Sequence, residues 1–101
     1  MHFLLLYDFQ PDYLQRRAPH RAAHLRLAWE AQERGELILG GALADPPDKG
    51  VLLFQGDNDR AARAFAEKDP YVQSGLVTNW SVRAWTTVVG AAAASPVRSP
   101  G

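Results

Sequence analysis

The residue in this sequence best suited to acid–base chemistry is Asp69, which opens the segment Asp69–Gly75 (Asp-Pro-Tyr-Val-Gln-Ser-Gly). Because the residue before a proline is driven towards extended or turn geometry, Pro70 should end the helix that precedes it. An ionised carboxylate is costly to bury unless it is paired, so Asp69 needs a partner. We therefore expect a carboxylate held on a rigid loop beside a group that it can bind.

His24 is the best candidate for that partner. A carboxylate bound to one imidazole nitrogen fixes the tautomer and leaves the other nitrogen free as a base. A helix N-terminus disfavours the imidazolium form while the carboxylate favours it, so the sequence leaves the protonation state open. Arg17 and Arg21 lie nearby in the sequence and could hold an anionic substrate by charge-assisted hydrogen bonds. The alternative interpretation of these arginines is an exposed basic patch.

Other side chains near these residues have more than one interpretation. His20 lies four residues before His24 on the same helix face, so a metal-binding pair is conceivable. The sequence has no His-Glu-x-x-His pattern and offers no third ligand beyond Asp69, so we predict neither a metal nor a cofactor. Tyr71 either lines the cleft or packs over its loop. Gly41 belongs to a double glycine, which marks either a bulge or a close approach, and we include it among the predicted substrate contacts.

The elements that must position these groups follow the order β-α-β-β-α-β. Apolar or alternating runs bounded by turn residues predict four strands, at residues 2–9, 36–44, 51–56 and 76–89. Two helices are predicted between them, at residues 19–34 and 60–68. One stripe of the longer helix consists of Leu25, Ala28, Trp29 and Gln32. We assign three tryptophans to the core or to a subunit interface: Trp29, Trp80 and Trp85.

This order is typical of the split βαβ, or ferredoxin-like, motif. It predicts an α+β fold with a four-stranded antiparallel sheet in the order 4-1-3-2 and two helices on one face. These helices run antiparallel, which places His24 and Asp69 at the same end of the domain. The other face carries too many apolar residues to leave in water, so we predict a homodimer through this open sheet face. Residues 1–89 form the predicted domain, and residues 90–101 a flexible tail.

Composition excludes several classes of function. The 101 residues suffice for one hydrophobic core, and 11 basic residues balance 11 acidic ones, which argues against a nucleic-acid partner. No segment approaches the roughly 20 apolar residues of a membrane span, and the apolar N-terminal stretch is too short for a signal peptide. The absence of cysteine rules out disulfides and a cysteine nucleophile. We expect a cytoplasmic protein with no membrane partner.

Three segments, in order, resemble the YCII-related (YciI-like) family. Arg17 with Arg21–Leu25 looks like its Arg-x-x-His-Leu helix start. Gly35–Gly41 looks like its Gly-x-Leu-x-x-x-Gly-Pro strand, although Ala42 stands in place of the proline. The segment that begins at Asp69 looks like its Asp-Pro-(Tyr/Phe)-x-x-(Ala/Ser)-Gly signature. The resemblance spans roughly residues 1–88.

The resemblance implies a dimeric α+β barrel with His24 and Asp69 as an active-site pair in a cleft. Most members of the family have no known function. A related member in aromatic degradation is a dehydrochlorinase, and muconolactone isomerases share the wider fold. Kinship of fold transfers no chemistry by itself.

Two functions remain as alternatives. The first is a cofactor-independent lyase or isomerase in which His24 moves a proton on a small anionic substrate and Asp69 orients His24. The second is a non-catalytic dimeric module that binds a small ligand or assists another protein, in which the same pair only ties two helix ends together. A hydrogen-bonded pair beside an open cavity favours the first function. A buried pair without a cavity favours the second.

Overall fold

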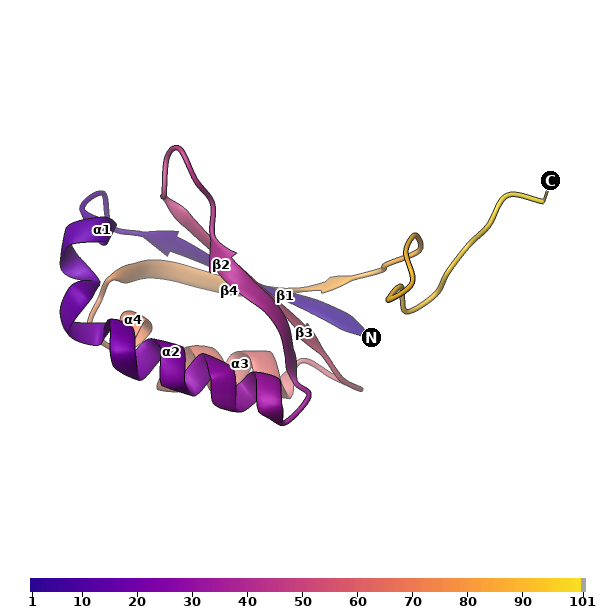
Figure 1. Ribbon diagram of the computed structural model, residues 1–101, viewed down its shortest axis with the longest axis horizontal. Helices are drawn as coiled ribbons and strands as arrows, with labels where there is room; N and C mark the ends of the chain where they lie inside the picture. Colours follow the sequence, from indigo (N-terminus) through magenta and orange to yellow (C-terminus); the bar gives the residue numbers. More distant parts are fainter. Residues whose placement is uncertain (101) are drawn as a thin grey trace.

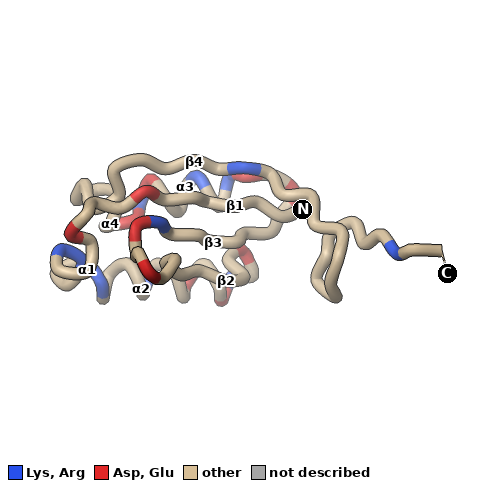
Figure 2. Tube along the Cα trace, turned by 90° about the horizontal axis from the view of Figure 1, so that it is seen from above, with Lys and Arg blue, Asp and Glu red and all other residues tan. Residues whose placement is uncertain are grey.

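The computed structural model describes residues 1–100 and places all helices on one face of a single sheet (Figure 1). The strands are β1 (His2–Phe9), β2 (Leu37–Ala42), β3 (Lys49–Gln55) and β4 (Val77–Trp85). They pair antiparallel in the order β2-β3-β1-β4, which Figure 2 shows from above. This is the predicted order 4-1-3-2, so the ferredoxin-like α+β prediction is confirmed.

Two longer helices cover the sheet, α2 (Ala18–Glu33) and α3 (Arg60–Lys68). Two short helices precede and follow them, α1 (Tyr13–Arg16) and α4 (Pro70–Gln73), of which the second was not predicted. The second of these replaces the predicted loop, because a proline at the first helical position and an aspartate before it favour a helix start. Within residues 1–100, no helix is long and apolar enough to cross a membrane.

The core lies between the helices and one face of the sheet. Alternate residues of β1 point to this face, because side chains of a strand alternate between its two sides. Phe3, Leu5 and Tyr7 are therefore buried, and β3 supplies Leu52 and Phe54 beside them. The helices contribute Ala31, Ala62, Phe65 and Ala66.

The predicted apolar stripe of α2 does not join this core. Trp29 is 62% exposed and Leu25 is 37% exposed, whereas Ala31 is the buried residue of α2. Of the two alternatives for Trp29, the core is therefore excluded, because its side of α2 faces a cavity, and the subunit interface stays a prediction. Trp80 does pack against the core, and Trp85 is 47% exposed.

The opposite face of the sheet carries no helix within residues 1–100 (Figure 1). Leu4 pairs with Leu53 and Leu6 with Val51 on this face, and all four side chains are only half-buried. Leu39 pairs with Leu53 and is 71% exposed. The apolar open face predicted from the sequence is therefore present.

After β4 the chain runs away from the sheet (Figure 1). Its first part folds back on itself: the Ser95 N–H donates to the Thr87 carbonyl at 3.0 Å, and the Val97 N–H donates to the Val88 carbonyl at 2.9 Å. The flexibility predicted for residues 90–101 stays a prediction, and residue 101 lies outside the described residues.

Candidate active site

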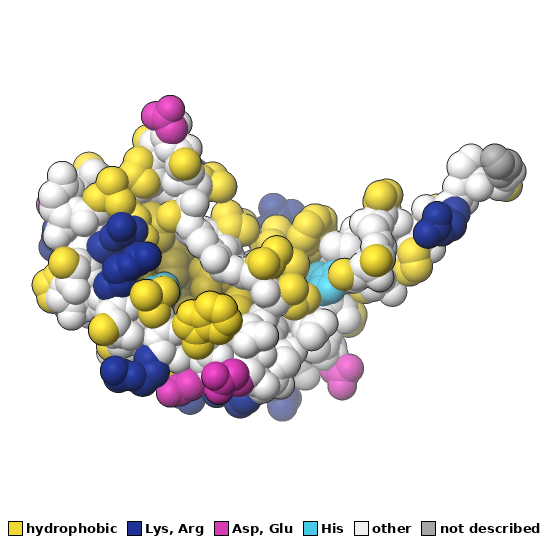
Figure 3. Space-filling view, viewed as in Figure 1, with side chains coloured by type: hydrophobic (Ala, Val, Ile, Leu, Met, Phe, Trp, Pro, Cys, Tyr) yellow, Lys and Arg dark blue, Asp and Glu magenta, His cyan; other side chains and the backbone are white. Residues whose placement is uncertain are grey.

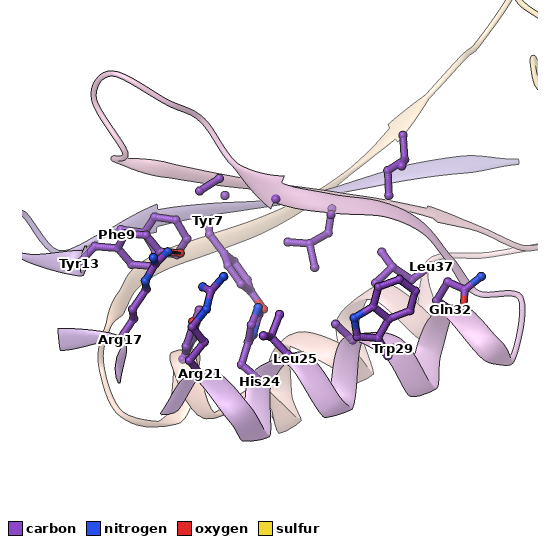
Figure 4. A pocket seen from close by; sticks show the side chains of 18 of the residues that line it. Tyr7, Phe9, Tyr13, Arg17, Arg21, His24, Leu25, Trp29, Gln32 and Leu37 are labelled. Carbon is purple, nitrogen blue, oxygen red and sulfur yellow. Dashed lines mark hydrogen bonds between the residues drawn. The ribbon is translucent and has the colours of Figure 1, made fainter. Parts of the chain in front are cut away.

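A cavity of about 360 Å³ lies between α2 and the part of the sheet formed by β1, β2 and β3 (Figure 4). Figure 3 shows it as a hollow with basic side chains at one end and hydrophobic side chains along the rest. His24 lines it from α2. The four predicted substrate contacts line the same cavity: Arg17, Arg21, Gly41 and Tyr71. The structure thus brings these predicted site residues together.

Asp69 lies behind the cavity wall and is completely buried. Its Oδ2 accepts a hydrogen bond from the Tyr7 hydroxyl at 2.7 Å. Its Oδ1 lies 2.8 Å from His24 Nδ1 and accepts from the Tyr71 backbone N–H at 3.0 Å. Three protein donors therefore replace the water that the buried carboxylate has lost, which meets the condition for burying a charge.

The local sequence explains how Asp69 is held. It ends α3 in an extended conformation and caps α4, whose first residue is Pro70. A capping aspartate accepts from a backbone N–H of the first turn, here that of Tyr71. The start of α4, rather than the predicted loop, therefore holds the Asp69 carboxylate in place towards His24.

The hydrogen bond to Asp69 decides which nitrogen of His24 is free. A carboxylate only accepts hydrogen bonds, so Nδ1 carries a proton and donates it to Oδ1. Nε2 has no hydrogen-bond partner within residues 1–100, and the side chain is 15% exposed. With Nδ1 bound to Asp69, Nε2 is the ring nitrogen left to act as a base on the cavity wall.

Aromatic packing fixes the plane of the His24 ring. Tyr71 lies parallel to it, with ring centroids 3.8 Å apart and an interplanar angle of 5°. Phe65 meets the same ring edge-on at 6.2 Å. Tyr71 consequently lines the cavity and also packs within the site, so both interpretations of this residue hold.

The hydroxyl of Tyr71 is buried and has no hydrogen-bond partner within residues 1–100. Burial raises the pKa of Tyr71 above its ordinary value, and the nearby Arg21 guanidinium partly opposes this shift. The hydroxyl therefore keeps its proton at neutral pH and is a donor without an acceptor. A buried polar group of this kind is unusual and points to a ligand atom.

An aromatic cluster holds Arg17 at the same end of the cavity. Its guanidinium lies 5.4 Å from the centre of the Tyr13 ring, and Tyr13 stacks on Phe9 with centroids 3.9 Å apart. Gly50 leaves room for this stack, because a Cβ there would lie 2.9 Å from Phe9 Cζ. The cluster orders an arginine that would otherwise be mobile.

The charge of the cavity is positive. Arg17 and Arg21 line it, and no aspartate or glutamate of the described chain does. Within residues 1–100, neither arginine forms an ion pair. Figure 2 shows basic residues at this end of the molecule, around α1 and the start of α2. Two guanidinium groups without a counter-charge suit an anionic ligand.

Metal binding by His20 and His24 was another possibility that the sequence raised. No three His, Cys, Asp or Glu side chains in the described chain are grouped so that they could hold a metal ion. His20 does not line the cavity. The expectation that the site works without a metal or cofactor stays a prediction.

Tyr7 is the site residue that sequence reasoning missed. It was placed in an apolar strand with no chemical role, yet its hydroxyl holds one oxygen of Asp69 and its ring lines the cavity. The position of Tyr7 in the sequence could have indicated this role. Tyr7 shares a strand face with buried Leu5, and a buried tyrosine hydroxyl needs a hydrogen-bond partner.

Comparison with known proteins places the chain among relatives of similar length. A family model described as the YCII-related domain matches residues 1–86. Protein YciI of Escherichia coli O6:H1 and Protein YciI of Shigella flexneri are each 29% identical to this chain over 97 residues. Each match covers 87% of this chain and 99% of the relative.

Among solved structures, one similar chain is 5-chloro-2-hydroxyhydroquinone dehydrochlorinase (TftG) from Burkholderia phenoliruptrix AC1100, in complex with 2,5-dihydroxybenzoquinone. The TM-score is 0.71 at 24% identity, and the likeness covers 86% of this chain and 95% of that chain. At this identity the likeness shows the shared fold alone.

The Tyr7–Asp69 hydrogen bond predicts a pH dependence of stability. Burial, and then the charge of Asp69, hold the pKa of Tyr7 far above its ordinary value of 10.0. Above that pH the unfolded chain loses the Tyr7 proton while the folded chain keeps it. The folded state then binds more protons, so the free energy of unfolding falls as pH rises.

We expect Tyr7→Phe to lower the free energy of unfolding near neutral pH by about 1–3 kcal/mol, because Asp69 loses a donor. Above pH 10.0 the difference in free energy of unfolding between the variant and the wild type should shrink. Ionisation of Tyr7 then stabilises the unfolded wild type, and the variant has no hydroxyl to ionise. Urea denaturation at a series of pH values measures both effects. Parallel stability curves for the two proteins would contradict this prediction.

Proposed function

We propose that this chain, which belongs to the YCII-related domain family, is a lyase or isomerase that uses His24 to move a proton on a small organic anion. The observation that carries the proposal is the hydrogen-bonded series Tyr7–Asp69–His24, which ends at a free Nε2 beside an open, positively charged cavity. A dehydrochlorinase shares the fold, which is in keeping with an enzyme.

The proposed reaction begins with proton abstraction from a substrate carbon by His24 Nε2. The electron pair of the broken C–H bond forms a new double bond within the substrate. In a lyase reaction the bond from the neighbouring carbon to a leaving group breaks as this double bond forms, and the leaving group departs as an anion with the electrons of that bond. In an isomerase reaction the pair shifts along the substrate, and the His24 imidazolium returns the proton to a different carbon.

The neighbours of His24 would stabilise the charges that develop during this step. The Asp69 carboxylate lies beside Nδ1 and favours the imidazolium form without taking the proton itself. Arg17 and Arg21 face the cavity and would stabilise negative charge that gathers on a substrate oxygen. The wall around the pair is aromatic, which strengthens each of these interactions.

The non-catalytic alternative predicts a different environment for the His24–Asp69 pair. A purely structural pair needs no cavity, whereas His24 is partly exposed and lines one. Asp69 is fully buried and touches His24 only from behind. The hydrogen-bonded pair beside an open cavity is the geometry that favours the enzyme.

We also propose that the chain forms a homodimer through its open sheet face. The half-buried side chains of Leu4, Leu6, Val51 and Leu53, with exposed Leu39, form an apolar surface that the helices do not cover. The same surface of a second copy would cover it by two-fold symmetry.

A deuterium-exchange screen tests the catalytic proposal and does not require that the product be identified. Small organic anions are incubated with the protein in D₂O, and exchange at carbon is followed by NMR. We expect His24→Ala to slow the exchange of an active compound by about 10²- to 10⁴-fold, because the base is lost. The matched control is His20→Ala on the same helix, outside the cavity.

Two results would contradict the catalytic proposal. One is undiminished exchange by the His24→Ala protein. The other is equal loss in the His24 and His20 variants, which would indicate a general effect on the helix. Under the non-catalytic alternative, His24→Ala changes only thermal stability.

Light scattering tests the dimer. The wild type should have twice the 11.1 kDa mass of the chain at micromolar concentration. Leu53→Lys should shift it to the monomer, because the charge would be buried in the interface without a partner. Leu14→Lys is the control, since Leu14 lies on α1 and is 50% exposed. A monomeric wild type would refute the proposed interface.

A further inference from the structure

We infer that the cavity takes an amphipathic ligand: an organic anion whose charged head lies near His24 and whose apolar arm lies against Trp29. The inference rests on the proposed function and names the class of its substrate. It comes from the unequal chemistry of the two ends of one cavity (Figure 4).

The head end supplies donors and positive charge. Arg17 and Arg21 provide guanidinium groups with no ion-pair partner in the described chain. The buried Tyr71 hydroxyl adds a donor with no acceptor within residues 1–100. One ligand oxyanion can accept from all three, which removes the cost of the unpaired hydroxyl. The donors are independent of the proton-transfer pair, because Asp69 is fully occupied behind His24.

The other end of the cavity is apolar. Its side chains come from α2 and from the strands that face it: Leu25, Ala28, Trp29, Leu37 and Leu52. Trp29 is 62% exposed, which is unusual for a large apolar side chain that lines a cavity. An apolar ligand arm would remove this surface from water.

The spacing along α2 sets the length of the ligand. Arg21 and Trp29 are eight positions apart on one helix, which places them about 12 Å apart along its axis. Figure 4 shows them at separate ends, with Leu25 between them. A ligand that contacts both therefore carries an arm of several carbon atoms beyond its charged head.

The apolar end stays open because β2 has a glycine there. A Cβ at Gly40 would lie 3.4 Å from Leu52 Cγ and 4.0 Å from Leu37 Cδ1, two side chains of the cavity wall. A Cβ at Gly41 would meet nothing within 4 Å. Gly40 is therefore the glycine that shapes the apolar end, whereas the sequence pointed to Gly41.

A chain-length series tests the inference on the intact protein. Acetate, butyrate, hexanoate and octanoate are titrated by calorimetry or NMR. We expect affinity to rise about threefold for each added methylene, because each one is taken out of water. Primary alkylamines of the same length should bind at least tenfold more weakly, since their charge opposes that of the arginines. A flat series, or equal binding of the amines, would overturn the inference.

Variants separate the two ends. Trp29→Ala and Gly40→Val should each flatten the dependence on chain length while butyrate still binds. Arg21→Gln should weaken every acid by a similar factor, and the control Arg26→Gln, outside the cavity on the same helix, should not. Circular dichroism of each variant checks that it is folded. If either Trp29→Ala or Gly40→Val does not fold, the other variant still tests the apolar end.

The binding series and the exchange screen can fail separately. A flat series with His24-dependent exchange would overturn the ligand class and leave the proposed function intact. A steep series in a protein whose exchange does not depend on His24 would refute the catalytic role and leave a binding site for amphipathic anions.

Discussion

The structure depends on one buried charge. Asp69 has no exposed surface, and such a carboxylate survives in a protein interior only when fixed donors replace its hydration. Here the donors come from three separate elements: Tyr7 of β1, His24 of α2 and the Tyr71 backbone of α4. The same interaction therefore joins the sheet to the helices and fixes the two side chains that link Asp69 to the cavity.

This arrangement separates the acid from the base. The carboxylate is hidden behind the wall, where it can act only through its neighbours, while the free nitrogen of His24 lies at the cavity. Hiding the negative charge leaves Arg17 and Arg21 as the charged groups that an entering ligand meets. Under the proposed function, an anion would be attracted to the base without a competing carboxylate, and the aromatic walls would keep the reacting atoms in a medium of low polarity.

Much of the fold was predictable because its elements are separated by strong turn residues and follow a common order. The proximity of His24 and Asp69 followed from the antiparallel helices alone. Tyr7 was missed because a hydroxyl buried in a strand shows its partner only when the packing is known. The core alternative for Trp29 failed because apolar spacing on a helix does not distinguish a core from a cavity.

The choice between Gly40 and Gly41 shows a further limit. Regular alternation from buried Leu37 would turn Gly41 towards the helices. A bulge between Leu37 and Leu39 adds one residue to β2, so Gly40 pairs with inward-facing Leu52 instead. A shift of one residue in a strand exchanges its two faces, and the double glycine indicates a bulge or a close approach without fixing the position of the bulge.

The central claim is that Asp69 holds His24 in the tautomer with a free Nε2. Long-range ¹H–¹⁵N NMR of the labelled protein, with His24→Ala for assignment, measures this state directly. At a pH where the ring is neutral, the account predicts a protonated Nδ1 and an unprotonated Nε2. It also predicts that this preference is lost in Asp69→Ala. A wild-type His24 with its proton on Nε2 would contradict the account.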